Sequence, residues 1–195
     1  MPVNLKDFAV GYYTSGGFAT LPLIEKDGEQ LKAEKTALFE KGKMVNELNA
    51  EESFSLSVAT LPLRLASYTT QVEGVDRTLS IRQSKSARKL TLKDGKPYLR
   101  LEVTLYAGIE DNAAARPVEE LSDAGAISPA VLAVASESLA AQITALHEKC
   151  KAVGFDIFGS EELLKKYSFK AYEEQKEGLS ERIILDLSVR FEGVR

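Results

Sequence analysis

The folds open to this chain are limited most by an apolar stripe from Leu132 to Val153, which follows a predicted helix running from Ser128 to about Ala152. Apolar residues recur there every three or four positions, at Leu132, Ala135, Leu139, Ile143, Leu146, Cys150 and Val153. This spacing predicts one apolar side on a helix about 36 Å long, with Ser128 as N-cap and Pro129 at the first helical position. Burying its four larger side chains contributes on the order of 10 kcal/mol, so we expect the helix to pack on a sheet.

Two stretches show the alternation of strands that are covered on one side only. Apolar residues occupy every second position at Leu99, Leu101, Val103 and Leu105, and again at Ile183, Leu185, Leu187, Val189 and Phe191. Before the first of them, Asp94-Gly95 is a strong hairpin signal that closes a strand beginning at Leu90, and a shorter alternation surrounds Leu79 and Ile81. Such alternation favours an antiparallel sheet with one face in water.

The first third of the chain predicts three more strands and a short helix. The strands are expected at Phe18–Lys26, Leu31–Phe39 and Met44–Leu48, and Pro22 favours an edge position for the first. Asn49 is a candidate N-cap for a helix that reaches about Val58. The stretch Thr60–Val75 has no clean period and is predicted as strand only in part.

After the long helix, residues Gly154–Ser160 form a connector, Ser160 is the expected N-cap of a helix to about Tyr167, and a second short helix is predicted at Phe169–Lys176. The predicted fold is α+β: a curved antiparallel sheet of about four to six strands, with one long helix on one face and short peripheral helices. Residues 1–195 are expected to form a single domain in which residues 1–17 are loosely ordered.

The charge pattern argues against a nucleic-acid partner. The net charge is −4 and the basic residues are spread along the chain, so no strong field exists to hold a phosphate backbone. The nearest approach to a basic cluster is Lys85, Arg88 and Lys89, which we interpret as a solvated edge or turn. The start of the chain lacks a signal-peptide pattern and no stretch approaches 20 apolar residues, so the chain as given is predicted to be soluble.

Reactive side chains are few. The only histidine, His147, is followed three residues later by the only cysteine, Cys150, and no internal disulfide can form. We expect His147 at the surface or its boundary and Cys150 as a small core residue. Carboxylate pairs at Glu51-Glu52, Glu119-Glu120 and Glu161-Glu162 suit the first turns of helices. The sequence therefore predicts no catalytic, cofactor-binding or metal-binding residues, and no enzyme.

Two segments carry a family resemblance: Ala37–Glu52 and Leu146–Ser168, followed by the strand Ile183–Phe191. They resemble the C-terminal domain of the C subunits of spore germinant receptors. In that family a strand ending in phenylalanine leads through a lysine-rich turn to an acidic helix start, and a long helix is followed by an Asp-hydrophobic-hydrophobic-Gly element like Asp156–Gly159. The chain departs from the family in lacking tryptophan after the short basic helix, where Tyr172 is a candidate replacement.

The resemblance implies a cellular location and partner subunits. Full-length members resemble lipoproteins on the outer face of the spore inner membrane, beside the integral-membrane subunits of the receptor. Membrane association would come only through a lipidated parent chain or through these partners, and Cys150, on a predicted helix, is not the lipidated cysteine. The chain is either an excised domain or a stand-alone homologue.

No catalytic residue or cofactor follows from the resemblance. The four residues Phe155, Asp156, Phe158 and Gly159 are expected to form a structural motif: Asp156 caps the coming turn or helix, the phenylalanines anchor the connector, and Gly159 adopts a conformation barred to other residues.

Three functions remain open. The first is a non-catalytic interaction or scaffold domain of a germinant receptor, with Tyr98, Tyr106 and Ile184 as interface candidates on the wet sheet face. The second is a small-molecule, germinant-like binding domain, which needs a cavity of about 300 Å³ or more. The third is an enzyme, which needs His147 or a carboxylate in a cleft. The germinant, the contacted partner and the oligomeric state stay open.

Overall fold

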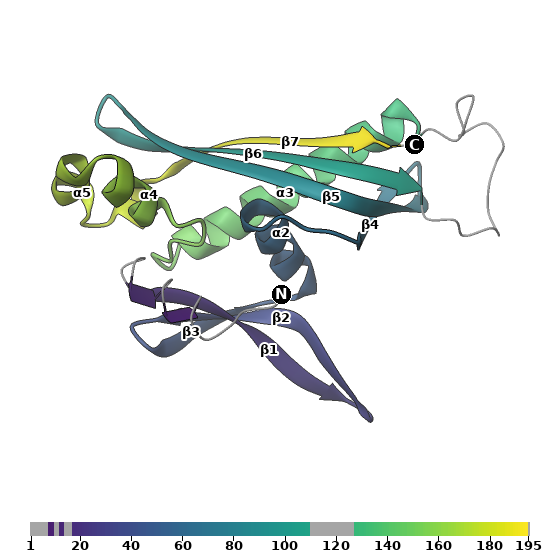
Figure 1. Ribbon diagram of the computed structural model, residues 1–195, viewed down its shortest axis with the longest axis horizontal. Coiled ribbons are helices and arrows are strands. Elements are labelled where there is room, and N and C mark those ends of the chain that lie inside the picture. Colours follow the sequence, from purple (N-terminus) through teal and green to yellow (C-terminus); the bar gives the residue numbers. More distant parts are fainter. Residues whose placement is uncertain (1–7, 10–11, 14–16, 110–126, 195) are drawn as a thin grey trace.

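The computed structural model describes residues 8–9, 12–13, 17–109 and 127–194. Most of residues 1–17, predicted to be loosely ordered, and the Glu119-Glu120 pair lie outside the described residues. Along the chain the elements are β1 (Phe18–Asp27), β2 (Gln30–Glu40), β3 (Lys43–Leu48), α2 (Ala50–Thr60), β4 (Ala66–Val72), β5 (Val75–Lys93), β6 (Lys96–Ile109), α3 (Pro129–Lys151), α4 (Ser160–Tyr167), α5 (Phe169–Gln175), α6 (Leu179–Arg182) and β7 (Ile184–Gly193) (Figure 1). The short α6 was not predicted.

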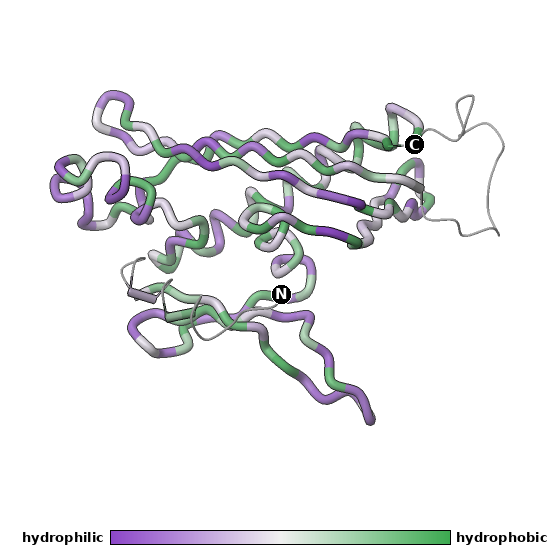
Figure 2. Tube along the Cα trace, viewed as in Figure 1, coloured by the Kyte–Doolittle hydropathy of each residue, from purple (hydrophilic) through white to green (hydrophobic). Residues whose placement is uncertain are grey.

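The first sheet is an antiparallel meander in the order β1-β2-β3. Its strands confirm the three predicted in the first third of the chain. Pro22 lies in the edge strand β1. Its missing N–H therefore does not interrupt the hydrogen bonds to the neighbouring strand. The β1–β2 hairpin projects away from the rest of the molecule (Figure 1), and its tip is hydrophilic (Figure 2).

The second sheet has the order β4-β5-β6-β7. The predicted Asp94-Gly95 hairpin joins β5 and β6, and the alternation of Leu99 to Leu105 directs those side chains into the core. However, β7 pairs with β6 in parallel, so the prediction of a wholly antiparallel sheet was wrong for this pair. Apolar alternation shows which face of the sheet a residue occupies, but it does not show the direction of the neighbouring strand. A parallel pair requires a long crossover connection, and α3 lies in the one between β6 and β7.

The strand β5 continues through the polar interval that separated two predicted strands. A register shift against β6 between Ile81 and Gln83 adds one residue, Arg82. Core-facing residues are therefore odd-numbered before the bulge, as in Ile81, and even-numbered after it, as in Ser84. This change of face concealed a single long strand in the sequence.

The helix α3 begins as predicted, because the Ser128 hydroxyl accepts a 3.3 Å hydrogen bond from the Ala130 N–H and Pro129 follows it. Its stripe packs against β7, β4 and α2. Val153 lies past the helix end and is exposed, whereas Val131 and His147 join the buried side. Among described residues this helix alone is long and apolar enough to cross a membrane, a criterion that core helices of water-soluble proteins also meet.

The helix α2 connects the two sheets. Its capping box is complete: the Asn49 side chain accepts from the Glu52 N–H and the Glu52 carboxylate accepts from the Asn49 N–H, both at 2.9 Å. It contacts β2 and β3 on one side and β5 and β6 on the other. One continuous buried cluster includes Leu38 of the first sheet, Leu101 of the second and Leu139 of α3. The predicted α+β class with one long helix on a sheet face is confirmed, with two sheets in place of one.

Candidate functional site

The connector between α3 and α4 is anchored by two phenylalanines. Phe155 and Phe158 are 4% and 1% exposed, and the Phe155 N–H donates to the Cys150 carbonyl oxygen at 2.9 Å across the end of α3. Gly159 has a φ of 67°, in the left-handed region that disfavours residues with a Cβ. The chain therefore leaves α3, buries two rings and turns into α4 within a few residues.

Asp156 supplies the side-chain cap at the start of α4. Its Oδ2 accepts a 2.8 Å hydrogen bond from the Glu161 N–H. Burial raises the pKa of the Asp156 carboxyl, while hydrogen bonds from the N–H groups of Glu161 and Ser160 and the charge of Arg88 oppose that rise. Ser160, predicted as the N-cap, is instead the first helical residue and Gly159 takes the cap position. The cap comes from further upstream because glycine has no side chain to provide it.

Arg88 of β5 also holds the connector, which the sequence did not indicate. Its Nη1 donates to the carbonyl oxygen of Phe158 at 2.6 Å. Arg88 pairs with core-facing Leu101 in the β5–β6 ladder, which directs its side chain to the helix-covered face. Arg88 lies in a polar part of the sequence, where nothing predicted a contact with the distant connector.

His147 is 4% exposed, so its predicted position at the surface or boundary was wrong. Its ring stacks on Phe158, with the centroids 5.9 Å apart. Burial lowers the pKa of His147, opposed by Glu148 and by a hydrogen bond to the backbone of Ile183. Its Nε2 atom has no hydrogen-bond partner among the described residues. The connector that covers α3 accounts for this burial.

Cys150 is buried as predicted, and burial raises the pKa of its thiol to about 12. A thiolate is the reactive form of cysteine, so this environment makes Cys150 a weak nucleophile at neutral pH. Within the described part of the chain, no three or more His, Cys, Asp or Glu residues are grouped so that they could hold a metal ion.

The predicted interface residues lie on the sheet face opposite α3, but they do not form one patch. Tyr98 of β6 and Ile184 of β7 are ladder partners, and Ile184 is 37% exposed. Tyr106 is eight residues further along β6, about 26 Å away at strand spacing, and pairs with Glu192. The structure therefore places Tyr98 with Ile184 and leaves Tyr106 at the other end of the face.

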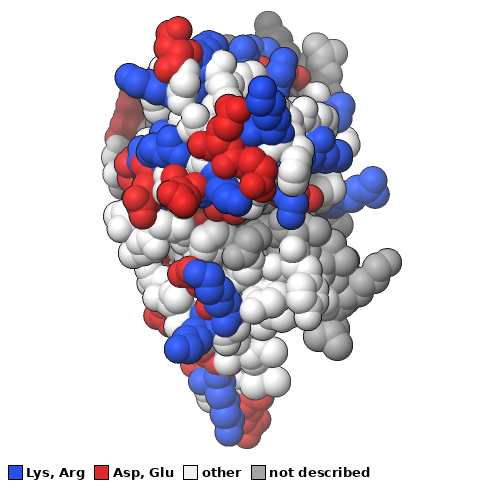
Figure 3. All heavy atoms as spheres, turned by 90° about the vertical axis from the view of Figure 1, so that its left-hand side faces the viewer, with Lys and Arg blue, Asp and Glu red and all other residues white. Residues whose placement is uncertain are grey.

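Charged side chains occupy the face between these two ends. Arg100 and Glu102 form a 2.8 Å ion pair, and the ammonium groups of Lys93 and Lys85 lie 5.4 Å and 5.3 Å from the ring centres of Tyr98 and Tyr106. Near the β5–β6 turn and the short helices, acidic and basic side chains are mixed on the surface (Figure 3). The face thus combines rigid aromatic ends with a polar centre.

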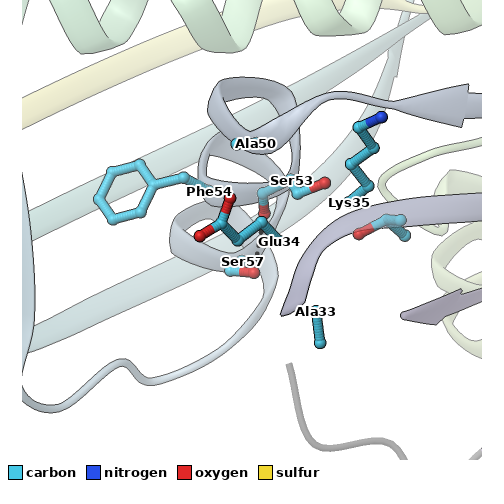
Figure 4. A pocket seen from close by; sticks show the side chains of 8 residues that line it. Ala33, Glu34, Lys35, Ala50, Ser53, Phe54 and Ser57 are labelled. Atoms are coloured by element: carbon cyan, nitrogen blue, oxygen red, sulfur yellow. Dashed lines mark hydrogen bonds between the residues drawn. The ribbon is translucent and has the colours of Figure 1, made fainter. Parts of the chain in front are cut away.

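Concavities formed by described residues provide two further candidate sites. A groove of about 740 Å³ lies beside β5, lined by Gln83 to Arg88, by Glu102 and Thr104, and by Thr60, Pro62 and Leu163. A smaller hollow of about 230 Å³ lies between β2, which provides Glu34 and Lys35, and α2, which provides Ser53, Phe54 and Ser57 (Figure 4).

Comparison with known proteins identifies the family. Residues 34–192 match the family described as spore germination B3/GerAC-like, C-terminal. This chain belongs to that family. The match covers the connector, the second sheet, β3 and most of β2, and it leaves β1 outside.

A solved structure supports the GerAC-like fold. The crystal structure of the GerBC protein aligns with a TM-score of 0.82 and 14% sequence identity, covering 100% of this chain and 62% of the other. The present chain therefore spans less than two thirds of the GerBC chain. No match was found among curated proteins. At this identity the likeness shows the fold, and the family match assigns the chain to the spore germination proteins.

Proposed function

We propose that this GerAC-like domain is a non-catalytic protein-interaction or scaffold domain of a spore germinant receptor. The observation that carries the proposal is the face of the four-stranded sheet opposite α3, on which Tyr98 and Ile184 lie exposed or half-exposed in ladder register. Helix contacts to this sheet come from α2, α3, α4 and α6. Amphipathic aromatic side chains held on a rigid sheet are typical of interface anchors.

The partners in this proposal are the integral-membrane subunits of the receptor, and the location is the outer face of the spore inner membrane, within a lipoprotein parent. Residues 1–195 act as one domain, which is supported by the buried cluster that joins both sheets through Leu38, Leu101 and Leu139.

The test is reconstitution with those integral-membrane subunits in nanodiscs. We expect Ile184→Asp to weaken binding about tenfold or more, because it places a charge at the centre of an apolar contact. Ile24→Asp is the matched control, since Ile24 is an exposed isoleucine of β1 on the other sheet. Equal binding by both variants and the wild type would exclude the Tyr98–Ile184 face as the interface.

A second candidate function is binding of a germinant-like small molecule. The groove of about 740 Å³ beside β5 favours it, since Gln83, Lys85 and Glu102 bring polar groups to its lining. Thermal denaturation with a panel of amino acids, sugars and nucleosides tests this function. A concentration-dependent rise in Tm that is lost in Gln83→Ala would support it, and an unchanged Tm throughout the panel would oppose it.

A further inference from the structure

The strand β5 has a free edge along its second half. Its neighbour β4 pairs only with Val75–Ile81. From Ser84 to Lys93, β5 is bonded to β6 on one side, and the described ladders place no strand on the other (Figure 1). An unpaired strand edge presents a row of backbone donors and acceptors to which another strand can add.

The hairpin turn determines which backbone groups point to this edge. Lys93 and Lys96 flank the two-residue Asp94-Gly95 turn, and the residues flanking such a turn bond to each other. Odd-numbered residues of this stretch therefore bond to β6, and even-numbered ones direct N–H and C=O outward. The Ser84 N–H confirms the parity, because it donates to the Leu63 carbonyl oxygen at 3.0 Å, away from β6.

Four residues beyond Ser84 continue this outward row: Ser86, Arg88, Leu90 and Leu92. Within the described residues, no backbone hydrogen bond from another segment reaches them. The groove of about 740 Å³ is lined by the first two of them, together with Pro62 and Leu163 of α4. An extended chain thus finds both unpaired backbone groups and space beside them.

The charges of the side chains beside this edge indicate which charge a bound segment should carry. Lys85 and Lys89 flank the outward backbone groups of Ser86 and Arg88 on the open face of β5, and Arg88 lies on the helix-covered face. Glu102 across the ladder is already paired with an arginine. Two copies of this edge would bring like charges together, which disfavours self-pairing. An extended segment with Asp or Glu at alternate positions complements it.

We propose that this free edge of β5 binds an extended, acidic segment of a partner receptor subunit as an added strand. The inference rests on the proposed function, because it adds a strand contact at the edge of the sheet to the face contact proposed above for the same partner subunits. Backbone hydrogen bonds to Ser86 and Arg88 fix the added strand, and the basic side chains select acidic residues in it.

Hydrogen exchange of the domain bound to receptor integral-membrane subunits in nanodiscs tests the inference. Amides of Ser86 and Arg88 should become protected on binding, whereas those of Ala87 and Lys89 are already protected by the ladder with β6. A complex without new protection at Ser86 and Arg88 overturns the inference and leaves the proposed function standing. Failure to form any complex overturns both, and equal protection by empty nanodiscs would show a membrane contact instead of an added strand.

Proline variants provide a backbone-specific test. Ser86→Pro removes an outward N–H and leaves the β6 ladder intact, so binding should fall about tenfold with little change in Tm. Gln71→Pro is the matched control, because by the same parity argument its N–H points outward from β4 beside the Glu73-Gly74 turn. Lys89→Glu should also weaken binding. If Ser86→Pro and Lys89→Glu both bind like the wild type, the added-strand inference is wrong.

Discussion

The guanidinium of Arg88 donates a 2.6 Å hydrogen bond to the carbonyl oxygen of Phe158, which joins β5 to the connector after α3. Phe158 in turn stacks on His147 of α3. Strand, connector and helix therefore meet at one point, and the position of α4 along β5 depends on this contact.

Arg88→Met should lower the free energy of unfolding by about 1 kcal/mol, because it removes a charge-assisted hydrogen bond that is only partly shielded from water. Urea denaturation measures the change. Lys89→Met is the matched control, since Lys89 is exposed and lies on the opposite face of β5. Equal losses in the two variants would contradict a specific role for Arg88.

Asp156→Asn should change how stability depends on pH. Burial raises the folded-state pKa of Asp156 above its ordinary value of 3.8. Its contribution to stability is therefore complete below pH 3.8 and is lost as the pH rises through the folded-state value. Relative to the wild type, the variant should gain stability as the pH rises above 3.8, as measured by urea denaturation. The exposed Asp186→Asn serves as control, and the same trend in both would refute the prediction.

His147→Phe should remove a loss of stability in mild acid. Burial lowers the folded-state pKa of His147 below 6.5, so below pH 6.5 the unfolded chain takes up a proton that the folded chain does not. Wild-type stability should fall as the pH drops from 6.5 toward the folded-state pKa. Denaturation midpoints at pH 8 and pH 5 should differ less in the variant, which keeps a ring against Phe158. An identical difference in both proteins would show that His147 does not titrate in this range.

Cys150 should resist alkylation in the native protein. Burial raises its thiol pKa to about 12, so the thiolate fraction at pH 8 is very small. Mass spectrometry after iodoacetamide treatment should show little modification of the folded chain and full modification in urea. Rapid labelling of the native protein would indicate that the end of α3 opens frequently.

Local signals were the reliable part of the sequence. Asn49 and Glu52 form the predicted helix start, Asp94-Gly95 forms the predicted turn, and the stripe through Leu139 and Ile143 is buried. Each of these depends on side chains within a few residues of one another, so spacing alone was sufficient to find them.

Features that depend on residues far apart in the chain could not be predicted from sequence spacing. The bulge at Arg82 changes the core-facing parity, which divided β5 into two apparent strands. His147 is buried by Phe158, and Arg88 reaches the same connector. The predicted interface residues Tyr98 and Ile184 meet only because β7 pairs in parallel with β6, a direction that alternation does not encode.

That parallel pair also has a consequence for how the domain assembles. The strand β7 follows α3 and three short helices, yet it completes the sheet beside β6. Its contacts close a long chain loop, and such contacts form late and slowly compared with hairpins. Until β7 docks, the edge of β6 is exposed, so conditions that delay this step should favour aggregation of a partly folded chain.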